Sequence, residues 1–78
     1  MVDTSPMSKA RNLGDIFRAR GLSVVDVAAA TRIDASRLYK LRSAKVTPRT
    51  RGYHGQPGEA ARLARFLGMT EAALLRLF

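Results

Sequence analysis

The 78-residue sequence contains no cysteine and no tryptophan, and its aromatic side chains are three phenylalanines and two tyrosines. Without cysteine, neither disulfides nor thiolate zinc sites can hold the fold together, and nothing indicates an oxidising compartment. Apolar runs such as Val27–Ala30 are far shorter than a membrane span or a signal-peptide core. We therefore expect one small cytoplasmic domain with a modest aliphatic core and no contact with a membrane.

Acidic residues are also scarce. Six Asp and Glu stand against 14 Lys and Arg, which leaves a net charge of +8 at pH 7. Most of the excess lies between Arg32 and His54, where seven cations accompany a single carboxylate, Asp34. A solvated surface usually intersperses the two signs. This segregation predicts a polyanionic partner.

Apolar side chains recur at helical spacing in five segments, and no segment alternates like a strand, so the pattern predicts an all-α fold. Residues 1–8 are expected to form a flexible N-terminal segment and residues 9–78 a single domain. Ser8 can cap a first helix over about 9–20. Gly21 would end that helix by adopting a left-handed conformation.

Polar residues precede the next two helices in the manner of N-terminal caps. Ser23 and Asp26 form a Ser-x-x-Asp capping box, so a helix of about eight residues is expected to begin at Val24. Asp34 is expected to cap a third helix that reaches about Ser43. The inward side chains of the first three helices are predicted to be Leu13, Ile16, Phe17, Val24, Val27, Ala28, Thr31, Ile33, Leu38 and Leu41.

The helical pattern stops over 46–58, where three glycines and two prolines occur. Loops of this length in a compact domain are often functional, and this one carries cations but no carboxylate. Pro57 and Glu59 are expected to begin a fourth helix that Gly68 closes, and Thr70 to cap a fifth. The fourth helix is predicted to face inward with Ala60, Leu63, Ala64 and Leu67.

The stretch Val27-Ala28-x-x-x-Arg32-Ile33, followed by Leu38 and Leu41, has the register of a helix-turn-helix. Ala28 is small enough to let the second helix of such a unit cross closely. With Leu67-Gly68-Met69-Thr70 near the end, the chain resembles the phage Cro and repressor family over about 13–77.

The resemblance implies a compact five-helix, lambda repressor-like domain with the helix-turn-helix at helices two and three. It also implies a sequence-specific regulator of transcription that binds a double-stranded DNA operator and occludes a promoter.

Three positions depart from the pattern of that family. Arg32 stands where the family usually has glycine, so either Arg32 takes a left-handed conformation at about 1 kcal/mol or the turn has a different shape. Val24 replaces a polar residue that would contact DNA. The basic loop 46–58 is longer than usual and is expected to act as an extra backbone-binding arm.

The resemblance also assigns site residues. The residues implied to meet base edges are Ala35, Ser36, Arg37, Tyr39 and Lys40. The residues implied to contact phosphates are Ser23, Arg32, Arg42, Lys45, Arg49 and Arg51. Arg37 and Lys40 are expected to point outward, so that the fold needs neither.

The C-terminal residues suggest a weak homodimer. Leu74 and Leu77 suit an inward stripe, whereas Leu75 and Phe78 lie about 100° further round the helix and are expected to remain partly exposed. Related domains pair through this helix, which implies a dimer interface at Leu75 and Phe78. The alternative is a C-terminus folded loosely over the core.

Other functional classes have less support in the sequence. His54 is the single histidine, and no nucleophile elbow, phosphate-binding glycine loop or metal-ligand spacing occurs. We therefore expect no enzyme, no cofactor, no metal and no small-molecule substrate. An antitoxin-type interaction module with the same fold is the main alternative, and an exposed hydrophobic tail would favour it. RNA binding lacks the exposed aromatic residues that it usually needs.

Overall fold

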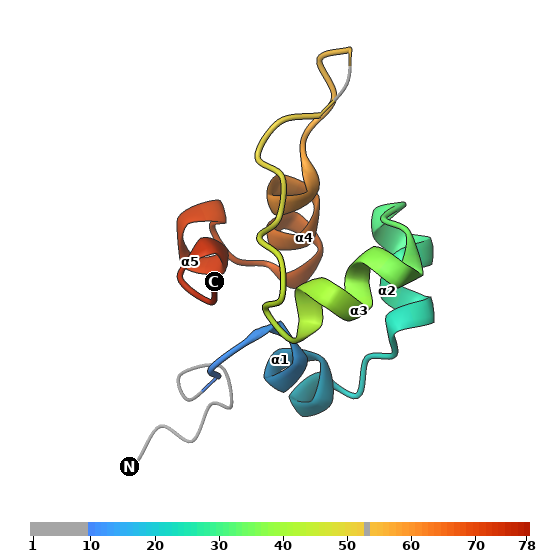
Figure 1. Ribbon diagram of the computed structural model, residues 1–78, viewed down its shortest axis with the longest axis vertical. Helices are drawn as coiled ribbons and strands as arrows, with labels where there is room; N and C mark the ends of the chain where they lie inside the picture. Colours follow the sequence, from blue (N-terminus) through green and yellow to red (C-terminus); the bar gives the residue numbers. More distant parts are fainter. Residues whose placement is uncertain (1–9, 53) are drawn as a thin grey trace.

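The computed structural model describes residues 10–52 and 54–78 of the chain. These residues form five helices around one core, with an irregular arm that projects from the helical body between the third and fourth helices (Figure 1). The helices are α1 (Leu13–Arg20), α2 (Val24–Thr31), α3 (Ala35–Arg42), α4 (Glu59–Leu67) and α5 (Glu71–Leu75). The predicted all-α class is confirmed.

The start of α1 differs from the prediction. Ser8 and the first helical residue expected lie outside the described part of the chain, and residues 10–12 are not helical. Asn12 caps the helix instead, because its side-chain oxygen accepts a hydrogen bond from the amide of Asp15 at 3.0 Å. Gly21 ends α1 at φ 66°, as expected. The predicted start at residue 9 was wrong because Asn12, and not Ser8, supplies the cap.

The caps of α2 and α3 differ from one another. The Ser23 hydroxyl accepts from the Asp26 amide at 3.1 Å, so half of the predicted capping box is confirmed. Asp34 occupies the N-cap position of α3, but its carboxylate makes no cap hydrogen bond. The carboxylate accepts from the Ser36 hydroxyl instead. The predicted cap at Asp34 is therefore right in position and wrong in chemistry.

Arg32 adopts the left-handed conformation, with φ 60° and ψ 30°. Its amide donates to the carbonyl of Ala28 at 2.8 Å, which closes the last turn of α2. The first of the two alternatives for this turn therefore holds, and a side chain at positive φ costs about 1 kcal/mol. Three residues, 32–34, join α2 to α3.

The core confirms the predicted inward faces. Its buried hydrophobic residues are Leu13, Ile16, Phe17, Val24, Val27, Ile33, Leu38, Leu41, Ala60, Leu63, Ala64, Leu67 and Leu74. Thr31 is buried as expected. Its hydroxyl is satisfied there because it donates to the Val27 carbonyl at 2.7 Å. Ala28 is only half-buried and packs against the core. Helix α4 contacts both α2 and α5, and α1 contacts α3.

Residues 49–52 and 54–57 form the described part of the projecting arm. Arg51 and Pro57 face each other across its two legs in an isolated antiparallel bridge. The legs pass so closely that a Cβ atom on Gly52 would lie 2.2 Å from the Gln56 carbonyl oxygen. A Cβ on Gly58 would lie 2.7 Å from the Arg49 carbonyl oxygen. Only glycine fits at either position.

At the C-terminus, Thr70 caps α5 as predicted by accepting from the Ala73 amide at 3.1 Å. Leu74 is fully buried. Leu75, Leu77 and Phe78 are half-buried and pack against the core, so the expected partial exposure of Leu75 and Phe78 is confirmed. Among the described residues, no helix has the length and hydropathy needed to cross a bilayer.

Candidate nucleic-acid interface

Helix α3 presents polar side chains on the side opposite its core contacts. Leu38 and Leu41 are fully buried, and this fixes the rotation of the helix about its axis. Ser36, Tyr39 and Lys40 are consequently exposed. Three of the five residues expected to meet base edges thus face solvent. A fourth, Ala35, is half-buried against the core.

The fifth, Arg37, is engaged within the protein. Its Nε donates to Glu59 Oε2 at 3.0 Å and its Nη2 to Glu59 Oε1 at 3.0 Å. The same Nη2 donates to the Thr47 carbonyl at 3.1 Å. The expectation that Arg37 points outward is therefore wrong. Its ion pair joins α3 to the first residue of α4.

Glu59 is a nearly buried carboxylate, 7% exposed. Burial alone would raise its pKa, but hydrogen bonds from the Arg37 side chain and the Arg49 amide, together with the charges of both arginines, hold the pKa below its ordinary value. The Arg49 amide lies 2.9 Å from Oε1. The hydrogen bond to Glu59 also raises the pKa of Arg37. The carboxylate is thus ionised and fully partnered.

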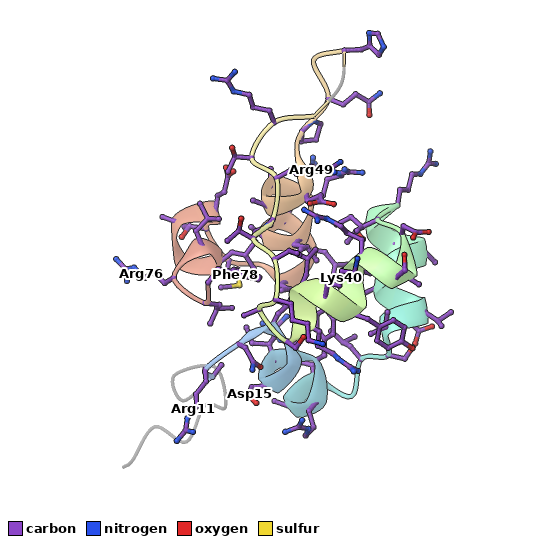
Figure 2. The ribbon with its side chains drawn as sticks, viewed as in Figure 1. Arg11, Asp15, Lys40, Arg49, Arg76 and Phe78 are labelled. Carbon is purple, nitrogen blue, oxygen red and sulfur yellow. The ribbon has the colours of Figure 1, made fainter. Side chains whose placement is uncertain are left out.

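A groove of about 400 Å³ runs between α3, the turn before it, the arm and α4. It brings together five of the residues predicted to contact bases or phosphates, which are Arg32, Ser36, Arg37, Lys40 and Arg49. Figure 2 shows Lys40 on α3 and Arg49 at the base of the arm on the side of the molecule that faces the viewer. We call this hollow the basic groove. Asp34 and Glu59 are its acidic members.

Arg62 also lines the basic groove, and the sequence analysis missed it. Its Nη1 donates to the Thr31 carbonyl at 3.2 Å and its Nε to the Gly58 carbonyl at 3.4 Å. These bonds hold the side chain between the end of α2 and the start of α4. The signal that could have found it is spacing, because Arg62 lies three residues after Glu59 and shares its face of the helix.

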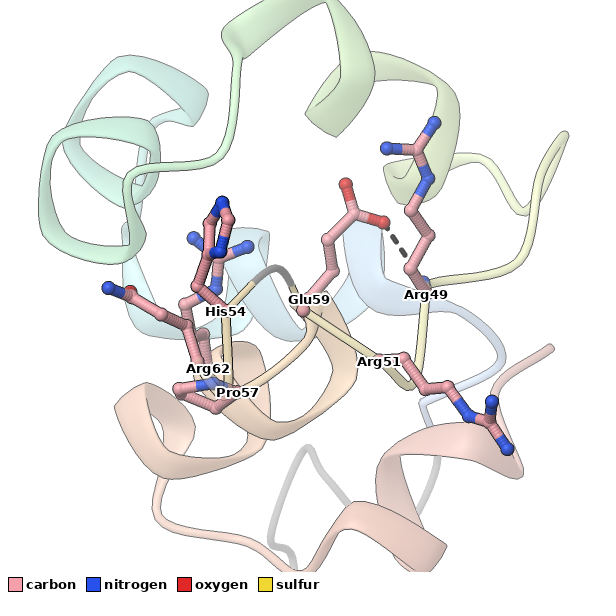
Figure 3. A pocket seen from close by; sticks show the side chains of 8 residues that line it. Arg49, Arg51, His54, Pro57, Glu59 and Arg62 are labelled. Atoms are coloured by element: carbon pink, nitrogen blue, oxygen red, sulfur yellow. Dashed lines mark hydrogen bonds between the residues drawn. The ribbon is translucent and has the colours of Figure 1, made fainter.

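A second hollow, of about 210 Å³, lies along the arm (Figure 3). Its lining residues include Arg49, Arg51, His54, Gln56 and Arg62. We call it the arm hollow. It shares Arg49, Glu59 and Arg62 with the basic groove, so the two hollows adjoin.

The remaining predicted phosphate contacts lie elsewhere. Ser23 is exposed at the start of α2, and Lys45 is exposed after the end of α3. Arg42 lies with its guanidinium carbon 4.9 Å from the centre of the Tyr39 ring. Arg42 lines a separate hollow together with Asn12 and Gly14. The structure therefore gathers about half of the predicted site into one groove.

Comparison of the chain with protein-family profiles, with curated proteins and with solved structures finds no significant match. Within the described part of the chain, no group of three or more acidic or histidine side chains is arranged to hold a metal ion.

Proposed function

We propose that this protein is a sequence-specific, double-stranded DNA-binding regulator of transcription that uses α2 and α3 as a helix-turn-helix. The observation that carries the proposal is the exposed face of α3 beside the basic groove. Lys40 and Ser36 are available there for base edges, with Arg32, Arg49 and Arg62 close by for phosphates. The proposed mode of action is that of a repressor of the phage Cro type, which occludes a promoter.

The dimensions of α3 support this role. The eight residues of α3 make a helix about 12 Å long. With its side chains a helix is about 10–12 Å across, and the major groove, about 12 Å wide, admits a helix of this diameter. Lysine can donate to guanine O6 and N7, and serine to several bases. Tyr39 is 50% exposed on the same face and can contact a base edge or sugar.

Arg37 has a different role in this proposal. Its Nε and Nη2 already donate to Glu59 and Thr47, so direct base reading is assigned to Ser36 and Lys40. Arg37 instead sets the position of α3 against α4. Arg42, Lys45, Arg49 and Arg51 are assigned to phosphates, as expected from the sequence.

The experiment that tests the function is selection of bound duplexes from a random library, followed by competition among the selected duplex, its single strands and an RNA duplex of the same sequence. An enriched motif that only the DNA duplex competes for would support the proposal. Absence of any motif, or equal competition by RNA, would overturn it.

A weak homodimer through Leu75 and Phe78 remains part of the proposal. Two half-sites about 34 Å apart would then give cooperative binding, which Leu75→Asp should reduce. Because Leu75 also packs against the core, the unfolding curve of the variant must be recorded alongside. A monomer in sedimentation at high micromolar concentration, with binding to a site that lacks two-fold symmetry, would exclude the dimer.

The antitoxin-type alternative has less support. It would be favoured by an exposed hydrophobic tail, but Leu75, Leu77 and Phe78 are half-buried against the core. The large hydrophobic side chains exposed in the described part of the chain are Val25, Tyr39 and Phe66, which lie on three different helices.

A further inference from the structure

We propose that a hollow between α2 and α4 is a docking site for an acidic peptide segment that carries one large apolar side chain. The hollow has a volume of about 270 Å³, and we call it the α2–α4 hollow. Its lining residues are Ala30, Thr31, Arg32, Arg62, Arg65 and Phe66. A protein partner at this surface goes beyond the proposed function, and only one consequence, competition with DNA, rests on that function.

The first argument is the exposed aromatic ring in the hollow. Phe66 on α4 is 39% exposed, and Ala30 on α2 is also exposed. Both side chains line the hollow. Removal of apolar surface from water is favourable, so a partner that covers Phe66 with an apolar side chain of its own gains affinity. One such anchor in a pocket often dominates the affinity of an interface.

The second argument is the charge around that ring. Three arginines, Arg32, Arg62 and Arg65, line the hollow, and no described carboxylate does so. Arg32 and Arg65 are exposed, and neither side chain makes a hydrogen bond or ion pair with another described residue. Arg62 is held in place because its Nη1 donates to the Thr31 carbonyl at 3.2 Å. Arginine suits carboxylates because its planar fork can donate two parallel hydrogen bonds.

The combination of ring and cations selects among the possible occupants. A phosphate backbone would pair with the arginines but would leave the ring of Phe66 without an apolar contact. A second copy of this chain is disfavoured by its net charge of +8 at pH 7. A segment with carboxylates on both sides of an aromatic or large aliphatic residue satisfies both the cations and the ring. Clusters of arginine recognise acidic segments in this way.

The position of the hollow gives the docking site a consequence. Arg32 and Arg62 line the basic groove as well as the α2–α4 hollow. A peptide in the hollow and a duplex in the basic groove would therefore require the same two cations. Under the proposed function, an acidic partner protein that docks here weakens DNA binding and releases the regulator from its operator.

The test selects short peptides from a random library displayed on phage, with the full chain as bait. The enriched peptide is then synthesised, and its affinity is measured for the full chain, Phe66→Ser and Arg65→Glu. Two matched controls are Val25→Ser and Arg76→Glu. Val25 is 67% exposed on α2 but does not line the hollow, and Arg76 is an exposed cation on the side of the molecule away from α2 (Figure 2).

We expect the enriched peptides to share an apolar residue flanked by carboxylates. Phe66→Ser and Arg65→Glu should each bind the synthetic peptide about tenfold more weakly, and the two controls should bind it as the full chain does. Acidic peptides without an apolar residue would reflect only the net charge and would overturn the inference, as would equal losses in all four variants. Unfolding curves are recorded for each variant. If Phe66→Ser is unstable, the exposed Arg65→Glu decides the outcome.

Competition is measured by titrating the peptide into a complex of the full chain with its selected duplex. A peptide whose apolar residue is replaced by serine is the control. Displacement by the first peptide alone would support competition, whereas unchanged duplex binding would overturn that step. Loss of duplex affinity in Phe66→Ser would instead place DNA in the hollow and overturn the docking site. Peptide binding in a chain that selects no duplex motif would retain the docking site and remove the proposed function.

Discussion

Arg37 on α3 and Glu59 at the start of α4 are joined by three hydrogen bonds of 3.0 to 3.2 Å, although 22 residues separate them in the chain. Because Glu59 is nearly buried, loss of its partner would leave an uncompensated charge. We expect Arg37→Ala to lower the free energy of unfolding by about 2 kcal/mol, less than for a fully buried pair, because the Arg37 side chain is partly solvated. Urea titration measures this.

The matched control for that variant is Arg18→Ala. Arg18 also pairs with a carboxylate, that of Asp15 at 3.7 Å, but its side chain is 84% exposed. Its replacement should leave the urea midpoint unchanged within error. Equal effects of the two variants on the urea midpoint would show that the ion pair at Glu59 stabilises the fold no more than an exposed ion pair does.

Acid should weaken the fold through Glu59. Its pKa is lower in the folded protein than in the unfolded chain, so on acidification the unfolded state takes up the proton first. The stabilisation is complete above about pH 5 and is lost as the pH falls through about 4 and below. The difference in unfolding free energy between the unmodified chain and Glu59→Gln should therefore be constant near neutrality and shrink in acid. A difference that grew in acid would contradict the sign of the shift.

Lys40 and Arg37 should differ in how they affect DNA binding. Lys40→Ala is expected to cost about 1–3 kcal/mol on the selected site and far less on random duplex, because it removes a base contact. Arg37→Ala should weaken both duplexes by a similar factor, because it disturbs the position of the whole helix. The ratio of the two affinities, measured for each variant, separates the roles. A fall in that ratio for Arg37→Ala alone would reverse the assignment.

Binding should depend steeply on salt. Four to six neutralised phosphates predict a slope of log affinity against log salt of roughly −4 to −5. Replacement of both Arg49 and Arg51 by alanine should flatten the slope by about two units, on selected and random duplexes alike. An unchanged slope would remove the arm from the interface.

Arg32 offers a test that separates stability from binding. Arg32→Gly removes the side chain from a left-handed position and should raise the free energy of unfolding by about 0.5–1 kcal/mol. The same change should weaken DNA binding, because a cation is lost from the basic groove. Arg32→Ala should weaken binding equally without the gain in stability, because alanine keeps the backbone strain. Thermal unfolding and duplex titration of the two variants provide the comparison.

Local signals explain which parts of the fold could be predicted from the sequence. The residues that end or begin a helix bond to backbone groups within a few residues of themselves, so their positions predicted the helix ends correctly. They are Gly21, Ser23, Gly68 and Thr70. The inward faces followed from helical periodicity. Asn12 was missed because Ser8 offered an equally good local cap.

The candidate site was harder to predict because its key contacts are not local. Nothing within one turn of Arg37 indicated that its partner would be Glu59. Arg62 was missed because it lies outside the charge-rich segment 32–54. The basic groove depends on where α4 lies relative to α3 after the arm, and no short-range sequence pattern predicts that position.

The close passage of the two legs at Gly52 and Gly58 divides the chain into a fixed body and an independently variable tip. Residues added beyond the crossing would lengthen the loop without moving any helix, at a closure entropy of only about 0.6 kcal/mol for each doubling of loop length. The length of the projecting arm can therefore change while the helical core stays constant. Relatives that differ in this one segment would be expected to share a core and, under the proposed function, to cover DNA sites of different lengths.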